Sequence, residues 1–134
     1  MKYLDSNIFI YAATLPTSDS KAKKSKQILL DMADGKFQGA TASLTWDELV
    51  WIVKRLSDKE IANKEGKKFL ELVNLKILSI DEGVLHRAQN LIDGYKLDPR
   101  DAIHVAVAIN NNITEFVSYD SDFDDLKEIK SKAP

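Results

Sequence analysis

Apolar residues along the chain fall into short strand-like runs and longer stripes with helical spacing. Tyr3 and Leu4 form the first short run, and the apolar residues 8–11 follow after Asp-Ser-Asn at residues 5–7, a typical helix start. A short buried strand is therefore expected to turn directly into a helix. Alternation predicts further strands at residues 38–42, 76–80, 115–119 and 126–129, and a frayed tail at residues 131–134.

Between these strands, apolar residues spaced three and four apart predict helices. The helices at residues 43–56 and 59–75 are expected to form a hairpin, with Ile61, Leu70 and Val73 among its inward residues. Trp46 and Trp51 lie in the first of the two, which makes the hairpin the candidate face for a homodimer. The remaining longer helices are expected at residues 21–36, at 81–95 with Asp81 as cap, and at 98–112 with Asp98 as cap.

Strands and helices alternate throughout, which indicates a single α/β domain over residues 1–134, with a parallel sheet covered by helices on both faces. No apolar run is long enough for a membrane span and no signal peptide is visible, so a cytoplasmic protein without a membrane partner is expected. The absence of cysteine excludes disulfides, thiolate zinc sites and cysteine nucleophiles. A net charge of -2 gives no global attraction to nucleic acid, so any such contact needs a local basic face.

Acidic residues follow two of the predicted strands and lie at the starts of two predicted helices. Asp5 follows the first strand and Asp120 the fourth, while Glu48 and Asp101 lie in first helical turns. If the first and fourth strands are neighbours, where the strand order of an open sheet reverses, Asp5 and Asp120 face each other across the crevice. Glu48 and Asp101 could enter the same crevice.

Each acid also has a plain structural interpretation as a helix cap. Asp5 and Asp120 could cap the turns that follow them, Glu48 could reach back to the amide of Thr45 in a capping box, and Asp101 lies in a typical helix start. A cap contributes about 0.5–2 kcal/mol. Two carboxylates about 5 Å apart repel by roughly 3 kcal/mol at an effective dielectric of 20. Convergence of the four would therefore require raised pKa values or a bound cation.

The residue types restrict which cation could bind. Carboxylate oxygens without cysteine or paired histidines favour a hard ion, Mg²⁺ or Mn²⁺. Such an ion suits phosphodiester chemistry, because it activates a bound water and offsets developing negative charge. The lysines at residues 21–26 form either a solvated face or a patch that contacts phosphates.

In length, element order and motifs, the chain resembles a PIN-domain ribonuclease of the VapC type, the toxin of a toxin–antitoxin pair. The resemblance covers nearly the whole chain. It depends on residues 5–7 (Asp-Ser-Asn), on Glu48, on residues 99–104 (Pro-Arg-Asp-Ala-Ile-His) with alanines following, and on residues 118–123 (Ser-Tyr-Asp-Ser-Asp-Phe). Ser118 departs mildly from the family, which more often has Thr there.

The resemblance implies a three-layer α/β/α sandwich with strand order 3-2-1-4-5. It also implies Mg²⁺- or Mn²⁺-dependent endonucleolytic cleavage of RNA, a homodimer, and a protein antitoxin whose tail blocks the acidic cleft. Asp5, Glu48, Asp101 and Asp120 are then the expected catalytic and metal-binding residues. Asn7 and Ser118 would orient these acids or the substrate, and Asp122 is expected to be auxiliary, as a further ligand or a cap.

Two other classes of function remain open. A Mg²⁺-dependent phosphatase of the haloacid-dehalogenase type would place two aspartates two residues apart after the first strand, whereas Asp5 is followed by Asn7. A non-catalytic interaction module would use all the acids as caps.

Overall fold

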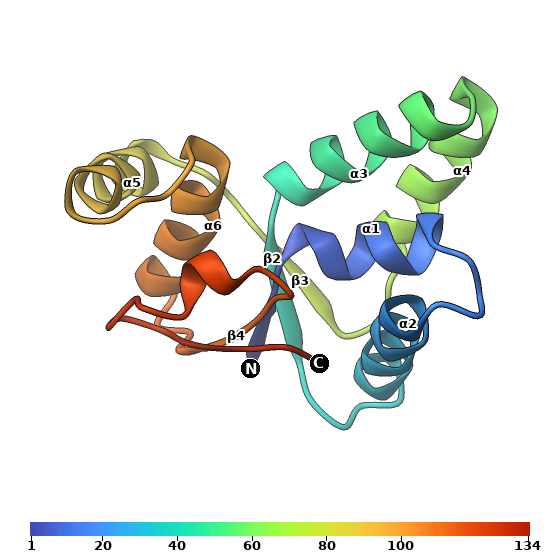
Figure 1. The fold of residues 1–134 in the computed structure, drawn as a ribbon, viewed down its shortest axis with the longest axis horizontal. Helices are drawn as coiled ribbons and strands as arrows, with labels where there is room; N and C mark the ends of the chain where they lie inside the picture. The colour runs from blue at the N-terminus through green and yellow to red at the C-terminus, as the bar shows by residue number, and fades with distance from the viewer.

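The computed structural model describes residues 1–134 as five strands with helices between them (Figure 1). The strands are β1 (Lys2–Leu4), β2 (Gly39–Ala42), β3 (Leu75–Leu78), β4 (Glu115–Val117) and β5 (Lys130–Lys132). The helices are α1 (Ser6–Thr14), α2 (Ser20–Ala33), α3 (Leu44–Leu56), α4 (Lys59–Leu70), α5 (Glu82–Gly94) and α6 (Pro99–Asn110), with a short 3-10 turn, η1 (Ser121–Phe123). None of the helices is long and apolar enough to cross a membrane.

All the strands run parallel in the order β3-β2-β1-β4-β5, as the resemblance implies. β1 is the central strand, with Tyr3 opposite Ala40 of β2 on one side and opposite Phe116 of β4 on the other. The strand order reverses at β1, so the carboxyl ends of β1 and β4 lie side by side at the position where open sheets bind ligands.

The sheet separates two apolar layers, because successive strand residues point to opposite faces. Tyr3 and Phe116 pack with buried residues of α5 and α6, while Leu4 and Val117 pack with those of α1 to α4. Figure 1 shows α5 and α6 on one side of the sheet and α1 to α4 on the other. The predicted three-layer α/β/α sandwich is therefore confirmed.

The C-terminal region differs from the sequence prediction. The last strand is Lys130–Lys132 rather than residues 126–129, and it pairs with β4, so residues 131 and 132 are not frayed. Leu126 and Ile129, which suggested a strand, are instead buried in the core beside α6. Their burial explains the apolar pattern without any strand.

The hairpin of α3 and α4 is confirmed, but α4 ends at Leu70 rather than near residue 75. Asn74, with φ of 62°, turns the chain into β3, and its side-chain amide donates to the carbonyl of Met32 at 3.0 Å. Val73 lies beyond the end of the helix and is exposed. Ile61 and Leu70 lie on the helix and are exposed as well, although all three were expected to face inward. Other large apolar side chains exposed on the hairpin are Trp46, Trp51 and Leu56.

Candidate functional site

Asp5 lies at the end of β1 with both carboxylate oxygens occupied. Its Oδ1 accepts the backbone N–H of Ser6 at 2.8 Å, which caps α1, and its Oδ2 accepts the hydroxyl of Ser118 at 2.7 Å. The side chain is buried, and this burial raises the pKa of the Asp5 carboxyl despite the nearby His104. Asp5 is thus a helix cap, as the sequence allowed. Its Oδ2 also bonds to Ser118 at the end of the neighbouring strand β4, which capping does not require.

Ser118 organises the neighbouring polar groups around its hydroxyl. While it donates to Asp5, its oxygen accepts the side-chain amide of Asn7 at 3.1 Å and the backbone N–H of Asp120 at 3.0 Å. The Oδ1 of Asn7 is buried and has no hydrogen-bond partner. An unpaired buried acceptor beside an acidic group is suited to bind a water or a cation, since leaving it unpaired has an energetic cost.

Three carboxylates gather next to this network. Asp101, Asp120 and Asp122 each offer an oxygen, and these oxygens lie within 4.8 Å of one another. Asp120 also accepts the backbone N–H of Asp122 at 2.9 Å, so it caps η1. Burial and the charges of Asp5 and Asp120 raise the pKa of Asp101 to about 7. The three carboxylates therefore repel one another when all are ionised, and a bound cation would reduce this repulsion.

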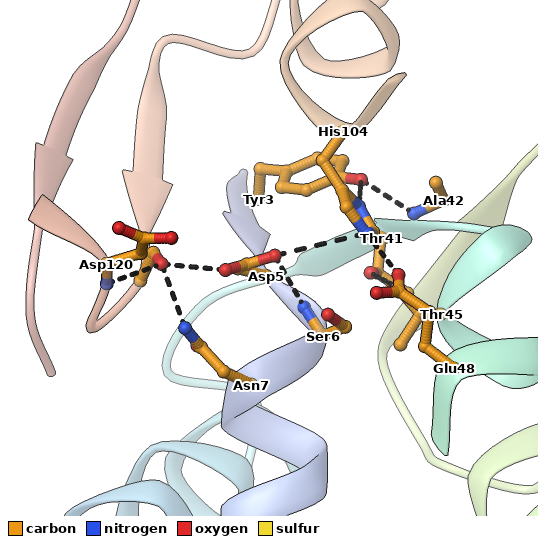
Figure 2. Close-up of polar contacts among 11 residues, drawn as sticks. Tyr3, Asp5, Ser6, Asn7, Thr41, Ala42, Thr45, Glu48, His104 and Asp120 are labelled. Atoms are coloured by element: carbon orange, nitrogen blue, oxygen red, sulfur yellow. Dashed lines mark hydrogen bonds and ion pairs between the residues drawn. The ribbon is translucent and has the colours of Figure 1, made fainter. Parts of the chain in front are cut away.

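Glu48 lies on the other side of Asp5 and contacts a histidine (Figure 2). Its Oε1 is 2.6 Å from Nε2 of His104, and the same nitrogen is 4.0 Å from Oδ1 of Asp5. Burial lowers the pKa of His104, but the hydrogen bond to Glu48 and the charges of Asp5 and Glu48 outweigh it and raise the pKa above its ordinary value. On its other ring nitrogen, His104 meets the hydroxyl of Tyr3 at 2.6 Å.

The capping-box interpretation of Glu48 is wrong. Its carboxylate binds His104, and no hydrogen bond joins it to the amide of Thr45. The hydroxyl of Thr45 pairs instead with that of Thr41 at 2.7 Å, and Ser43, the N-cap residue of α3, makes no side-chain capping bond. Glu48 therefore does not cap its own helix, α3.

The structure brings the sequence-predicted residues to one edge of the sheet in two groups. Asp101, Asp120 and Asp122 form one group, with Asp5, Asn7 and Ser118 beside it. Glu48 is paired with His104, but it shares a polar cavity of about 560 Å³ with Asp98, Pro99, Arg100 and Asp101. The donors near the carboxylate group are oxygens, so the residues present fit Mg²⁺ or Mn²⁺.

The chain has two histidines, His86 and His104, and the sequence assigned neither of them a role in the site. His86 is exposed and lies 3.4 Å from Glu82 of its own helix. His104 sits in the almost wholly apolar segment Ala102–Ile109, where a buried polar side chain needs partners. That requirement, together with the place of His104 in the motif at residues 99–104, could have marked it from the sequence.

Comparison with known proteins agrees with this architecture. The PIN domain family model matches residues 2–129. A VapBC2 structure from Rickettsia felis, bound to a promoter DNA fragment, has a TM-score of 0.75 and 21% identity, covering 99% of this chain and 98% of that one. A toxin–antitoxin complex from Klebsiella pneumoniae has a TM-score of 0.71 and 22% identity, covering 96% and 95%.

A third structure, the Mycobacterium tuberculosis toxin VapC20, which cleaves the sarcin–ricin loop, has a TM-score of 0.73 and 14% identity, covering 92% of each chain. At these identities the likeness concerns the fold. No curated protein sequence matches the chain.

Proposed function

Because the chain belongs to the PIN domain family, we propose that it is a Mg²⁺- or Mn²⁺-dependent endoribonuclease of the VapC toxin type. The observation that carries the proposal is the group of Asp101, Asp120 and Asp122, whose oxygens lie within 4.8 Å of one another at the carboxyl edge of the sheet. Structural neighbours that are toxin–antitoxin complexes support the toxin assignment.

In this proposal Asp101 and Asp120 hold the ion directly, while Asp5 and Glu48 act through water, and Asp122 is an auxiliary ligand. A bound ion would lower the pKa of a coordinated water and offset negative charge on the phosphate as the bond breaks. Asp101, with its pKa of about 7, carries a proton below that pH and releases it to become a ligand.

The surrounding residues orient the acids and the substrate. Ser118 fixes Asp5 through its hydroxyl, and Asn7 fixes Ser118. Lys21 lies over the rings of Tyr11 and Tyr119, with its Nζ 5.6 Å from each centroid. Tyr119 directly precedes Asp120 in the sequence, so Lys21 lies near the acidic site. Lys21 and the exposed Arg100 are our candidates for contacts with the RNA backbone.

We propose two protein partners. A groove of about 310 Å³ between α1, α2 and the hairpin has an apolar floor that includes Phe9, Leu29 and Phe69, with Lys26 and Lys68 at its rim. Its chemistry fits an amphipathic antitoxin segment with acidic flanks. The exposed apolar residues of the hairpin, Trp46 and Leu70 among them, fit a homodimer interface.

The direct test is cleavage of RNA by Asp5→Asn and Asp101→Asn variants in the presence of Mg²⁺. We expect each to lose on the order of a hundredfold or more in rate, because each change weakens the charge that holds the ion. Asp93→Asn, on the exposed face of α5, is the matched control and keeps its activity. Near-normal cleavage by a folded Asp5→Asn or Asp101→Asn variant would reject the assignment.

A non-catalytic module is the second candidate, because Asp5 and Asp120 do cap α1 and η1. Thermal unfolding separates the two. Mg²⁺ or Mn²⁺ at a hundred times its dissociation constant stabilises a chain with a specific site by about 2.7 kcal/mol, whereas a set of caps gains nothing. The Asp101→Asn variant should lose this gain.

A further inference from the structure

His104 is completely buried and has polar contacts with Tyr3 of β1, with Asp5 at the end of that strand, and with Glu48 of α3. It follows Asp101 by one turn of α6, so the two side chains project toward the same side of the helix. Asp101 reaches Asp120 and Asp122, while His104 reaches Glu48 and Asp5. Helix α6 therefore supplies one residue to each half of the acidic site.

The Nε2 atom of His104 lies between two carboxylates. Glu48 Oε1 is 2.6 Å away and Asp5 Oδ1 is 4.0 Å away. Because an ionised carboxylate only accepts hydrogen bonds, Nε2 must carry a proton toward them. The Nε2–H group of His104 therefore occupies the space between the carboxylates of Glu48 and Asp5. Without it, a metal ion would be needed there to reduce the repulsion between the two carboxylates.

Tyr3 prevents the imidazole from turning away. Its hydroxyl contacts Nδ1 of His104 at 2.6 Å and accepts the backbone N–H of Ala42 at 3.0 Å. Its ring is stacked on Phe116, with centroids 4.9 Å apart and an interplanar angle of 9°. Rotation of His104 would leave buried polar atoms without partners, which is costly.

The other half of the site has no such donor. Within 4.0 Å of the carboxylates of Asp101, Asp120 and Asp122 there is no lysine, arginine or histidine nitrogen. One half of the acidic site therefore has a hydrogen-bond donor from within the protein, His104, and the other half is open to a cation from solution (Figure 2 shows the first half).

We propose that His104 is a positioning residue that replaces a second metal ion. It holds Glu48 outside the coordination sphere and limits the site to one divalent ion, bound on the side of Asp101, Asp120 and Asp122. This inference rests on the metal dependence in the proposed function, and it adds the number of ions and the residue that sets it.

The test is a titration of the purified protein with Mn²⁺, followed by electron paramagnetic resonance. Wild type is compared with His104→Asn and His104→Gln. The Asn amide can replace Nδ1 toward Tyr3 but is too short to reach Glu48, whereas the Gln amide can replace Nε2 and donate to Glu48. Circular dichroism and thermal melting report whether each variant is folded.

We expect one Mn²⁺ per chain in wild type and in His104→Gln, with similar affinity and an uncoupled spectrum. His104→Asn should bind two, with a spin-coupled spectrum, because Glu48 and Asp5 lose the donor between them. Two ions in wild type, or one ion of unchanged affinity in folded His104→Asn, would overturn the inference. If the Asn variant does not fold, the wild-type count decides: one ion supports the inference and two overturn it.

Failure of the proposed function gives a different result. If folded wild type binds no Mn²⁺ at all, the metal requirement itself is wrong, and the inference falls with it. A protein that cleaves RNA with two ions keeps the proposed function and loses only the inference.

Discussion

The hydroxyl of Ser118 donates to Oδ2 of Asp5 over 2.7 Å and joins the ends of the two neighbouring strands β4 and β1. Ser118→Ala removes this donor and leaves Asp5 and the amide of Asn7 without their shared partner. We expect the free energy of unfolding to fall by about 1–3 kcal/mol, the cost of leaving a buried polar group unpaired. Urea unfolding measures the change.

Ser118→Thr is the matched control, since it retains the hydroxyl. It should keep most of the stability and the activity. A Ser118→Ala variant as stable as Ser118→Thr would mean that the hydrogen bond to Asp5 contributes nothing net.

Asp101 makes the stability of the metal-free protein depend on pH. Its pKa is about 7 in the folded protein and 3.8 without the fold's influence, so between these values the folded state binds more protons than the unfolded state. Stability must then fall as pH rises from about 4 to about 7. The raised pKa values of Asp5 and His104 act in the same direction.

Asp101→Asn removes this penalty, so above about pH 7 the metal-free variant should melt at a higher temperature than metal-free wild type. Below about pH 4 the difference should disappear. Thermal melts in chelator across this range measure both. Equal slopes of melting temperature against pH in the two proteins would show that Asp101 is not the group responsible.

The hairpin face can be tested through Leu70, which is 59% exposed on α4 beside Trp46. If this face is a homodimer interface, Leu70→Glu introduces buried charges in both copies and should convert a dimer to a monomer. Sedimentation velocity reports the mass. Leu85→Glu, on α5 and 51% exposed, should leave the mass unchanged. A dimer that survives Leu70→Glu places the interface elsewhere.

Gly39 begins β2 against the fully buried Met32. A Cβ at this position would overlap the Met32 sulfur, so the core must rearrange. Gly39→Ala should therefore lower the free energy of unfolding by about 1–3 kcal/mol. Gly94→Ala, where a Cβ meets no atom within 4 Å, should be neutral or slightly stabilising. Chemical denaturation of both variants separates overpacking from a general effect of replacing glycine.

Sequence patterns predicted a parallel sheet and acids at the ends of its strands because both follow from local rules, whereas the strand order came from the family resemblance. Asp5 and Asp120 each follow a buried strand, and a parallel sheet brings such positions to one edge. β5 could not be placed, because Lys130–Lys132 has no apolar pattern and becomes a strand only by pairing with β4. Strand propensity does not identify a strand that forms only because a neighbouring strand offers it hydrogen-bond partners.

The pairing of Glu48 with His104 was also beyond the sequence. The residues are 56 positions apart on different helices, and Thr45 three residues before Glu48 offered a local partner that the fold does not use. The Glu48 carboxylate could bond either to the nearby backbone or to His104. It bonds to His104, because that buried side chain needs a hydrogen-bond partner.

The central position of β1, between β2 and β4, has a consequence for synthesis on the ribosome. Asp5 is made well before the neighbouring strand β4 and before Asp120 and Asp122, which come much later in the sequence. Until β4 and these two aspartates have been made, a nascent chain carries an unfinished sheet with β1 at an open edge and an incomplete set of acids, because such distant contacts form late. Any cleavage of RNA by this protein can begin only after the codons for Asp120 and Asp122 have been translated.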